Sequence, residues 1–198
     1  MPKPPPRPTP KPKIIAPHGG YEQLKSYQAA EILFDATSAF CDRFIDPRSR
    51  THDQMVQAAR SGKQNIAEGS MASGTSSKME MKLLGVARAS HEELRQDFRD
   101  FLRLRGLPIW GKNHDKALAV RRLAYAPDRS YRTYRSHVEQ GTPEFAANTL
   151  LCLVHQACFL LDQQLRELEQ RFEREGGFTE RLYRARREAR EKGLPRPE

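Results

Sequence analysis

The sequence predicts an all-α protein, an antiparallel up-down four-helix bundle with a helical insertion and flexible basic ends. Long stretches carry apolar residues at three- and four-residue spacing, the period of one helix face. Helix-capping patterns stand between these stretches. No stretch shows the apolar–polar alternation that is typical of a strand.

The predicted domain organisation has three parts. Residues 1–17 hold eight of the 14 prolines, mixed with basic residues, which favours a disordered arm. Residues 18–177 form the bundle, with the insertion at 107–141. Residues 178–198 form a basic helix or tail.

The first two helices are predicted over residues 21–44 and from about 51 to 69. Leu24, Tyr27, Phe40 and Phe44 recur at helical spacing in the first. The pattern Thr51-His52-Asp53-Gln54 resembles a capping box and opens the second. Gly69 is expected to end that helix in a left-handed conformation, before a linker rich in Ser, Gly and Thr.

The third helix is predicted over residues 77–105, opened by a capping box of Ser77 and Glu80. The fourth begins at Thr142-Pro143-Glu144, with a capping threonine and a proline at the first helical position. Its stretch 150–161 is apolar nearly all round, which predicts a subunit interface as well as a core. Shorter helices are expected at 113–125, 130–140 and 180–192.

The corner between the second and third helices resembles a known family. Asn65-Ile66-Ala67-Glu68-Gly69, then Ser77-Lys78, and residues 87–90 with Glu93 are similar to bacterial four-helix-bundle proteins. These are encoded within intervening sequences of large-subunit ribosomal RNA genes. The accessory variability determinant of diversity-generating retroelements is a distant relative. The resemblance covers residues 21–106, and more weakly 143–172.

This chain departs from the short family members by its proline-rich head, its insertion and its basic tail, and so resembles the variant with a four-helix-bundle suffix domain. The resemblance implies a ring-like homo-oligomer, with a pentamer favoured. It also implies an accessory role beside a nucleic-acid-handling enzyme such as a reverse transcriptase.

The same corner predicts a buried polar cluster that fixes the register of the two helices. Residues three apart share a helix face, so polar side chains of the second helix can meet those of the third. The members are Arg60, Asn65, Glu68, Ser90 and Glu93, with Gly69 beside them. A catalytic pair of Glu68 and Glu93 is the alternative, but no nucleophile, histidine or metal pattern accompanies it.

The net charge of +9 favours a polyanionic partner, RNA or single-stranded DNA. Most of the excess lies in the ends: +4 in residues 1–13 and +3 in 178–198, against +2 in between. The tail candidates for phosphate contacts are Arg181, Arg184, Arg186, Arg187 and Arg190.

A second set of nucleic-acid candidates lies in the insertion. Arginines recur every third residue there and share one helical face beside a stripe of tyrosines, an arrangement that can pair with phosphates and stack on bases. The residues are Arg129, Tyr131, Arg132, Tyr134 and Arg135. The alternative is that the tyrosines pack the insertion onto the bundle while the arginines are solvated.

An arginine stripe on the third helix also has two interpretations, a phosphate rail or a salt-bridged solvent face. Acidic residues interleave with it at i,i+3 spacing, which favours the salt-bridged face. The arginines are Arg88, Arg95, Arg99 and Arg103.

The sequence predicts a chain that is not an enzyme and has neither a cofactor nor a metal. Walker, dinucleotide and nucleophile-elbow motifs are lacking, and the histidines are scattered. Three cysteines, without a C-x-x-C pair, favour a location in a reducing cytoplasm.

No membrane span is expected. Two functions follow: a non-catalytic nucleic-acid-associated protein, or a structural assembly protein that binds a protein partner.

Overall fold

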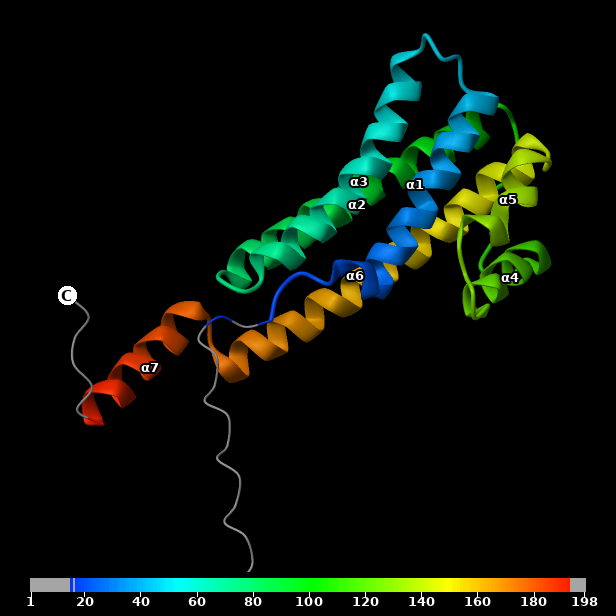
Figure 1. The fold of residues 1–198 in the computed structure, drawn as a ribbon. Coiled ribbons are helices and arrows are strands. Elements are labelled where there is room, and N and C mark those ends of the chain that lie inside the picture. Colours follow the sequence, from blue (N-terminus) through cyan, green and yellow to red (C-terminus); the bar gives the residue numbers. More distant parts are fainter. Residues whose placement is uncertain (1–14, 16, 193–198) are drawn as a thin grey trace, which may run out of the picture.

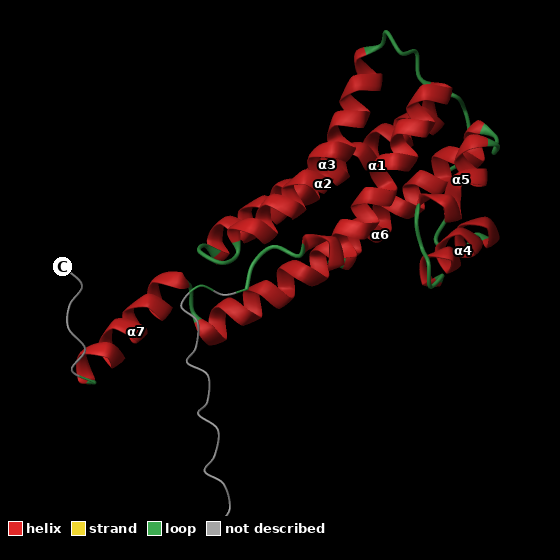
Figure 2. Ribbon diagram, viewed as in Figure 1, coloured by secondary structure: helices red, strands yellow, loops and turns green. Residues whose placement is uncertain are grey.

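In the computed structural model, residues 15 and 17–192 are described, and this part of the chain contains helices and no strands (Figure 2). The prediction of an all-α chain is confirmed. The predicted arm, apart from Ile15 and Pro17, and the last six residues lie outside the described part. The helices are η1 (Tyr21–Gln23), α1 (Lys25–Phe44), α2 (Arg50–Ala72), α3 (Ser77–Leu104), α4 (Asp115–Arg122), η2 (Leu123–Tyr125), α5 (Tyr131–Glu139), α6 (Pro143–Glu175) and α7 (Phe178–Glu191).

The four long helices pack in a closed order. α2 packs against α3, α3 against α6, α6 against α1, and α1 against α2. Figure 1 shows α2 and α3 running side by side, α6 running along the other long helices, and α7 extending beyond the C-terminal end of α6. The core is built from the inward faces of these helices. At its centre, the Phe40 ring meets Phe98 and Phe101 edge-on, with centroids 5.2 and 4.8 Å apart.

The insertion is folded onto the side of the long helices rather than hanging free. α5 packs on α1 and α6, and α4 packs on α6. Trp110 anchors the entry to the insertion: its backbone N–H donates to Asn148 Oδ1 at 2.8 Å, and its indole N–H donates to Glu144 Oε1 at 2.8 Å. Asn148 in turn donates to the carbonyl of Pro108 at 3.0 Å. These bonds satisfy polar groups that the packing removes from water.

This packing gives the apolar stretch 150–161 a different explanation from the predicted one. Leu150, Leu153 and Val154 are buried within the single chain, because α4 and α5 cover the side of α6 that the other long helices leave open. The insertion therefore accounts for most of the apolar surface that suggested a subunit interface. Phe159 is the exception, with 57% of its surface exposed.

The observed helix starts correct the sequence prediction in two places and confirm it in a third. α2 begins after Ser49, whose hydroxyl accepts from the backbone N–H of Thr51, so the predicted Thr51 box is already inside the helix. α3 is capped by Ser76 rather than by Ser77. At α6 the prediction is confirmed, since Thr142 accepts from the N–H of Phe145 and Pro143 takes the first position.

The expectation for Gly69 is wrong. Its backbone is helical, because α2 continues to Ala72 and Gly69 is not among the glycines with positive φ. The glycine instead permits close approach of α3: a Cβ at this position would lie 3.4 Å from the Glu80 carbonyl oxygen and 3.5 Å from Leu83 Cβ. These are ordinary contact distances, so the site has room for one methyl group and no more.

Two substitutions distinguish a helical Gly69 packed against α3 from a left-handed Gly69 that ends the helix. Gly69→Ala is expected to raise the free energy of unfolding by about 0.5–1 kcal/mol, because alanine favours the helix and its Cβ fits. Gly69→Val is expected to lower it by about 1 kcal/mol or more, because the branched methyls press on the Glu80 backbone. Urea titrations measure both, and a loss of stability in the alanine variant would contradict the helical assignment.

Among the residues that the structure describes, one segment meets the length and composition criteria for a membrane span. It is Pro143–Glu191, and the span would come from an apolar window within it. Most of that window is buried inside the protein, as in the core helix of a soluble protein. Length and composition alone are weak support for a span.

Candidate functional site

A small hydroxyl–amide cluster joins α2 and α3 within their lengths, away from the turn that connects them. Asn65 Nδ2 donates to the Ser61 carbonyl at 2.9 Å and contacts Ser61 Oγ at 3.2 Å. Ser61 Oγ and Ser90 Oγ lie 3.0 Å apart across the helix pair. Two of the predicted members are thus brought together, through a serine that the sequence did not single out. The others, Arg60, Glu68 and Glu93, are exposed.

A groove of about 440 Å³ runs beside this cluster. Arg50, Asp53 and Glu93 line it together with Ser61 and Ser90, so both signs of charge face it. Glu68 does not line the groove, and the pair Glu68–Glu93 is therefore not assembled there. The two serines bond to each other, so neither is set up as a nucleophile beside a base.

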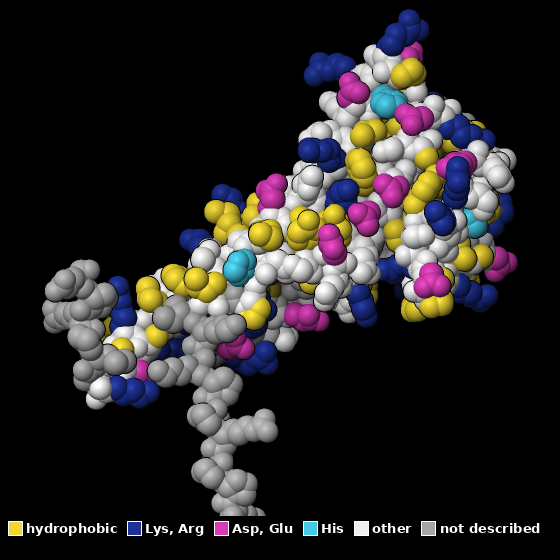
Figure 3. Space-filling view, viewed as in Figure 1, with side chains coloured by type: hydrophobic (Ala, Val, Ile, Leu, Met, Phe, Trp, Pro, Cys, Tyr) yellow, Lys and Arg dark blue, Asp and Glu magenta, His cyan; other side chains and the backbone are white. Residues whose placement is uncertain are grey.

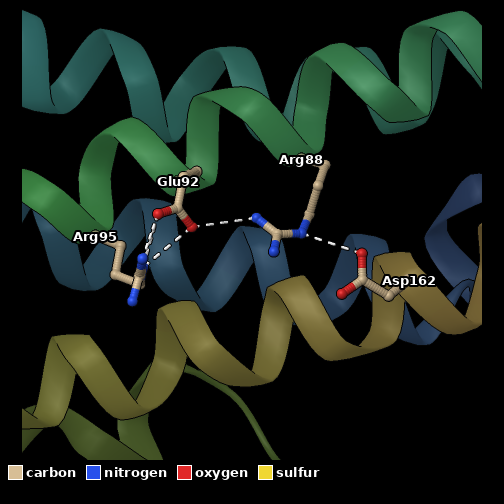
Figure 4. A network of polar contacts seen from close by, with 4 residues as sticks. All are labelled: Arg88, Glu92, Arg95 and Asp162. Atoms are coloured by element: carbon tan, nitrogen blue, oxygen red, sulfur yellow. Dashed lines mark hydrogen bonds and ion pairs between the residues drawn. The ribbon is translucent and has the colours of Figure 1, made fainter.

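Three of the four arginines of the α3 stripe, Arg88, Arg95 and Arg103, are salt-bridged, whereas Arg99 forms no ion pair in the described part of the chain. Arg88 Nε donates to Asp162 Oδ1 on α6 at 3.1 Å, and its Nη1 lies 3.4 Å from Glu92 Oε2. Arg95 bonds the same Glu92 (Figure 4). Paired guanidinium groups of this kind are not free for phosphates. Figure 3 shows cations and anions interspersed over the visible face of the molecule.

The insertion residues that the sequence proposed for base stacking are placed otherwise. Tyr134 is 1% exposed and packs in the core, and the Tyr131 hydroxyl donates to Glu139 Oε1 at 3.0 Å. Arg135 forms an ion pair with the same Glu139 at 2.8 Å. The tyrosines pack the insertion onto the long helices, as the alternative interpretation held. Arg132 is exposed.

Arg129 instead lies in a pocket of about 600 Å³ between the α4–α5 connection, α6 and the start of α1. We call this the basic-aromatic pocket. Its charged and aromatic lining comprises Lys25, Arg121, Tyr125, Arg129, His155 and Phe159, and the lining contains no Asp or Glu. Tyr125 is 89% exposed and Phe159 57% exposed, so both rings are open to a ligand.

Within the described residues, neither arginine of this pocket forms an ion pair. Arg129 Nη1 donates to the Ala124 carbonyl at 3.1 Å, and Arg121 donates to the carbonyls of Ala117 and Lys112. These acceptors are neutral, so the bonds orient the guanidinium groups without cancelling their charge. The pocket arginines therefore differ from those of the α3 face, which share carboxylates.

Sequence reasoning missed Tyr125 and Phe159. Phe159 sits in the apolar stretch of α6 and is typical there of a core residue. A signal was nonetheless present, since Cys152, His155, Gln156 and Phe159 have the i, i+3, i+4, i+7 spacing of one helix face. Tyr125 precedes the turn-forming Ala126-Pro127-Asp128, but nothing in the sequence joins it to that face.

The titratable groups of the pocket do not add nucleophilic or acidic chemistry. Burial lowers the pKa of His155; the positive charges of Arg95, Arg99 and Arg121 act in the same direction and Glu92 acts against them, so the neutral imidazole is favoured at neutral pH. Burial raises the pKa of the Cys152 thiol to about 11, so the thiolate is scarce. The pocket is suited to binding an anion with an attached ring, rather than to covalent catalysis.

The tail arginines lie on α7. Arg184 donates to the Glu175 carbonyl, and Arg187 lies 3.6 Å from Glu191. Arg186 and Arg190 are exposed, whereas Arg181 is half-buried. Two nitrogens of the Arg181 guanidinium, Nε and Nη2, are buried without a hydrogen-bond partner. The exposed arginines are spread along the helix rather than gathered at one site.

Within the described residues, no group of three or more His, Cys, Asp or Glu side chains could hold a metal ion. The chain matches no protein-family model, no curated protein and no solved structure. The geometry of the basic-aromatic pocket is therefore the main basis for assigning a function.

Proposed function

We propose that this protein is a non-catalytic binder of single-stranded nucleic acid, and that the basic-aromatic pocket is its contact site in the folded body. One observation carries the proposal: three cations and two exposed aromatic rings line one pocket whose lining has no acidic side chain. Proteins that bind single strands combine positive charge for the backbone with aromatic rings for the bases.

The roles divide by chemistry. Arg121 and Arg129 would face phosphate oxygens, because they bond only to backbone carbonyls in the described structure, and Lys25 adds a third cation to the lining. Tyr125 and Phe159 would stack on unpaired bases. A duplex would not offer those bases, so single strands are favoured over double strands. The arginines of α7, and the basic residues 1–13, would add contacts that depend on charge alone.

The long helices support the finer fold proposal, an antiparallel up-down four-helix bundle of α1, α2, α3 and α6. Each of them packs on two others in a closed order, and the short link between α2 and α3 favours an antiparallel pair. A ring-like homo-oligomer and an accessory role beside a reverse transcriptase rest on the family resemblance. Light scattering tests the oligomer, and a mass of 22.7 kDa would exclude it.

The binding test uses fluorescence anisotropy with a labelled single-stranded RNA and its DNA equivalent, on the full chain. In Arg121→Gln/Arg129→Gln, we expect a loss of affinity of about tenfold or more, and a log–log salt slope that is shallower by about 1.4, since each phosphate contact on a single strand contributes about 0.7. The matched control, Arg60→Gln/Arg166→Gln, removes two charges that are exposed and outside the pocket. It should change affinity by less than about threefold.

The aromatic residues give an independent readout. Tyr125→Ala/Phe159→Ala should weaken binding by about 1–3 kcal/mol per stacked base while leaving the salt slope unchanged. Equal losses in the pocket and control arginine variants would show that affinity follows the net charge of the protein and not the pocket. No binding by the full chain at low salt would reject the proposal and favour the structural assembly protein.

A further inference from the structure

We infer that the basic-aromatic pocket takes a single nucleotide bearing a terminal phosphomonoester, either at the end of a strand or free. This inference rests on the proposed function and goes beyond it, because a general single-strand site would be indifferent to the strand end. The arrangement and amount of charge, the size of the pocket and its remaining polar groups carry the argument.

The first step is the charge. Lys25 is the first residue of α1, Arg121 belongs to α4 and Arg129 to the α4–α5 connection, so three separate segments converge on one pocket. An internal phosphodiester carries one negative charge and is followed by another further along the strand. A phosphomonoester carries about −1.5 to −2 on one phosphorus at neutral pH, and offers three strong acceptor oxygens. Converging cations match that concentrated charge better than a charge spread along a chain.

The second step is the shape. The volume of about 600 Å³ lies within the range of small-ligand pockets, about 300–1,000 Å³. Walls come from α1, α4, the α4–α5 connection and α6. This is the size of a site for one nucleotide and not of an extended groove. Tyr125 and Phe159 stand on different walls, the first on η2 and the second on α6, so a base entering between them can stack on either ring.

The third step is the polar lining that remains. Gln156 lies beside the neutral His155 on the same face of α6. Its amide has both a donor and an acceptor, and the neutral imidazole has one of each. Such groups can bond to the edge of an unpaired base without adding charge. The pocket thus separates a cationic part for the phosphate from a neutral part for the base.

The experiment compares three single strands of one sequence with an internal fluorophore: one with a 5′ phosphate, one with a 3′ phosphate and one with neither. Adenosine 5′-monophosphate and adenosine serve as competitors. We expect at least one phosphorylated strand to bind the full chain about tenfold more tightly than the unphosphorylated strand. The monophosphate should compete, and adenosine should not.

Variants locate the effect. The preference for the phosphorylated end should disappear in Arg121→Gln/Arg129→Gln and remain in Arg60→Gln/Arg166→Gln, with circular dichroism showing that both variants are folded. Equal binding of the three strands would overturn the inference and leave the proposed function standing. Saturable binding of the monophosphate without binding of any strand would support the nucleotide site and overturn the proposed function. No binding of any of them would overturn both.

Discussion

Gly62→Ala is expected to lower the free energy of unfolding by about 2 kcal/mol or more, although alanine is the better helix former. Gly62 is buried on α2, and a Cβ there would lie 2.1 Å from His91 Nε2 and 2.3 Å from His91 Cδ2. The imidazole cannot retreat easily, since His91 is 0% exposed and packed on α3. α2 and α3 would have to move apart, and the resulting loss of close packing would destabilise the protein.

Chemical denaturation of a double-mutant cycle tests this clash. His91→Ala alone should destabilise by leaving a cavity, but Gly62→Ala/His91→Ala should be more stable than the sum of the two single losses predicts, by about 1 kcal/mol or more. Gly69→Ala is the matched control, because it makes the same change on the same helix where the Cβ fits. Strict additivity in the cycle would show that the two residues do not oppose each other.

His91 is also expected to make the protein sensitive to acid. Both of its ring nitrogens are buried without a hydrogen-bond partner, and burial, reinforced by the charge of Arg88, lowers its pKa to about 4. The neutral form is therefore favoured in the folded state. Its contribution to stability is fully present above pH 6.5, falls as the unfolded chain takes up the proton, and is lost below about pH 4. The lowering of the His91 pKa corresponds to about 3 kcal/mol in the free energy of unfolding.

The contribution of Asp97 to stability changes with pH in the opposite direction, and it must be separated from that of His91. Burial, with the negative charges of Glu93 and Asp100, raises the pKa of Asp97 to about 6. Its contribution to stability is present at low pH and is lost as the pH rises through 6. The measurement is therefore the difference in unfolding free energy between the wild type and His91→Leu, from pH 7.5 to 4. Asp97→Asn serves as the reciprocal control.

In the wild type, the stability relative to His91→Leu should fall as the pH drops, mostly between pH 6.5 and 4. Asp97→Asn should make the acid loss steeper, because the opposing contribution is removed. If the wild type and His91→Leu lose stability in parallel over this range, then His91 does not titrate as a buried neutral group.

The sequence predicted the helical elements well because their signals are local. The apolar spacing of residues 21–44 and 77–105, and the Thr142-Pro143 start, depend only on neighbouring residues. Gly69 was misread because a glycine within a helix and a glycine that ends one look alike in sequence. The approach of the Glu80 backbone distinguishes them, and that approach is a property of packing between two helices.

The candidate site was less predictable for the same physical reason. The repeat of Arg129, Arg132 and Arg135 is visible in sequence, but the partners that decide which charge is free are not. Arg135 forms an ion pair with Glu139, whereas Arg129 bonds to the Ala124 carbonyl and lines a pocket together with residues of α6. Tyr125 and Phe159 meet in one pocket because the insertion folds back on α6. Tertiary packing therefore determines which aromatic residues are exposed in the pocket, and no short motif encodes that packing.

The most direct test of the central claim maps where a single strand touches the protein. An RNA containing 4-thiouridine is bound to the full chain at low salt, crosslinked by light, digested, and the modified peptides are identified by mass spectrometry. The basic-aromatic pocket predicts adducts on peptides that contain Tyr125 and Phe159, reduced by unlabelled RNA and in Arg121→Gln/Arg129→Gln. Adducts confined to α7 and the chain ends, unchanged in that variant, would contradict it.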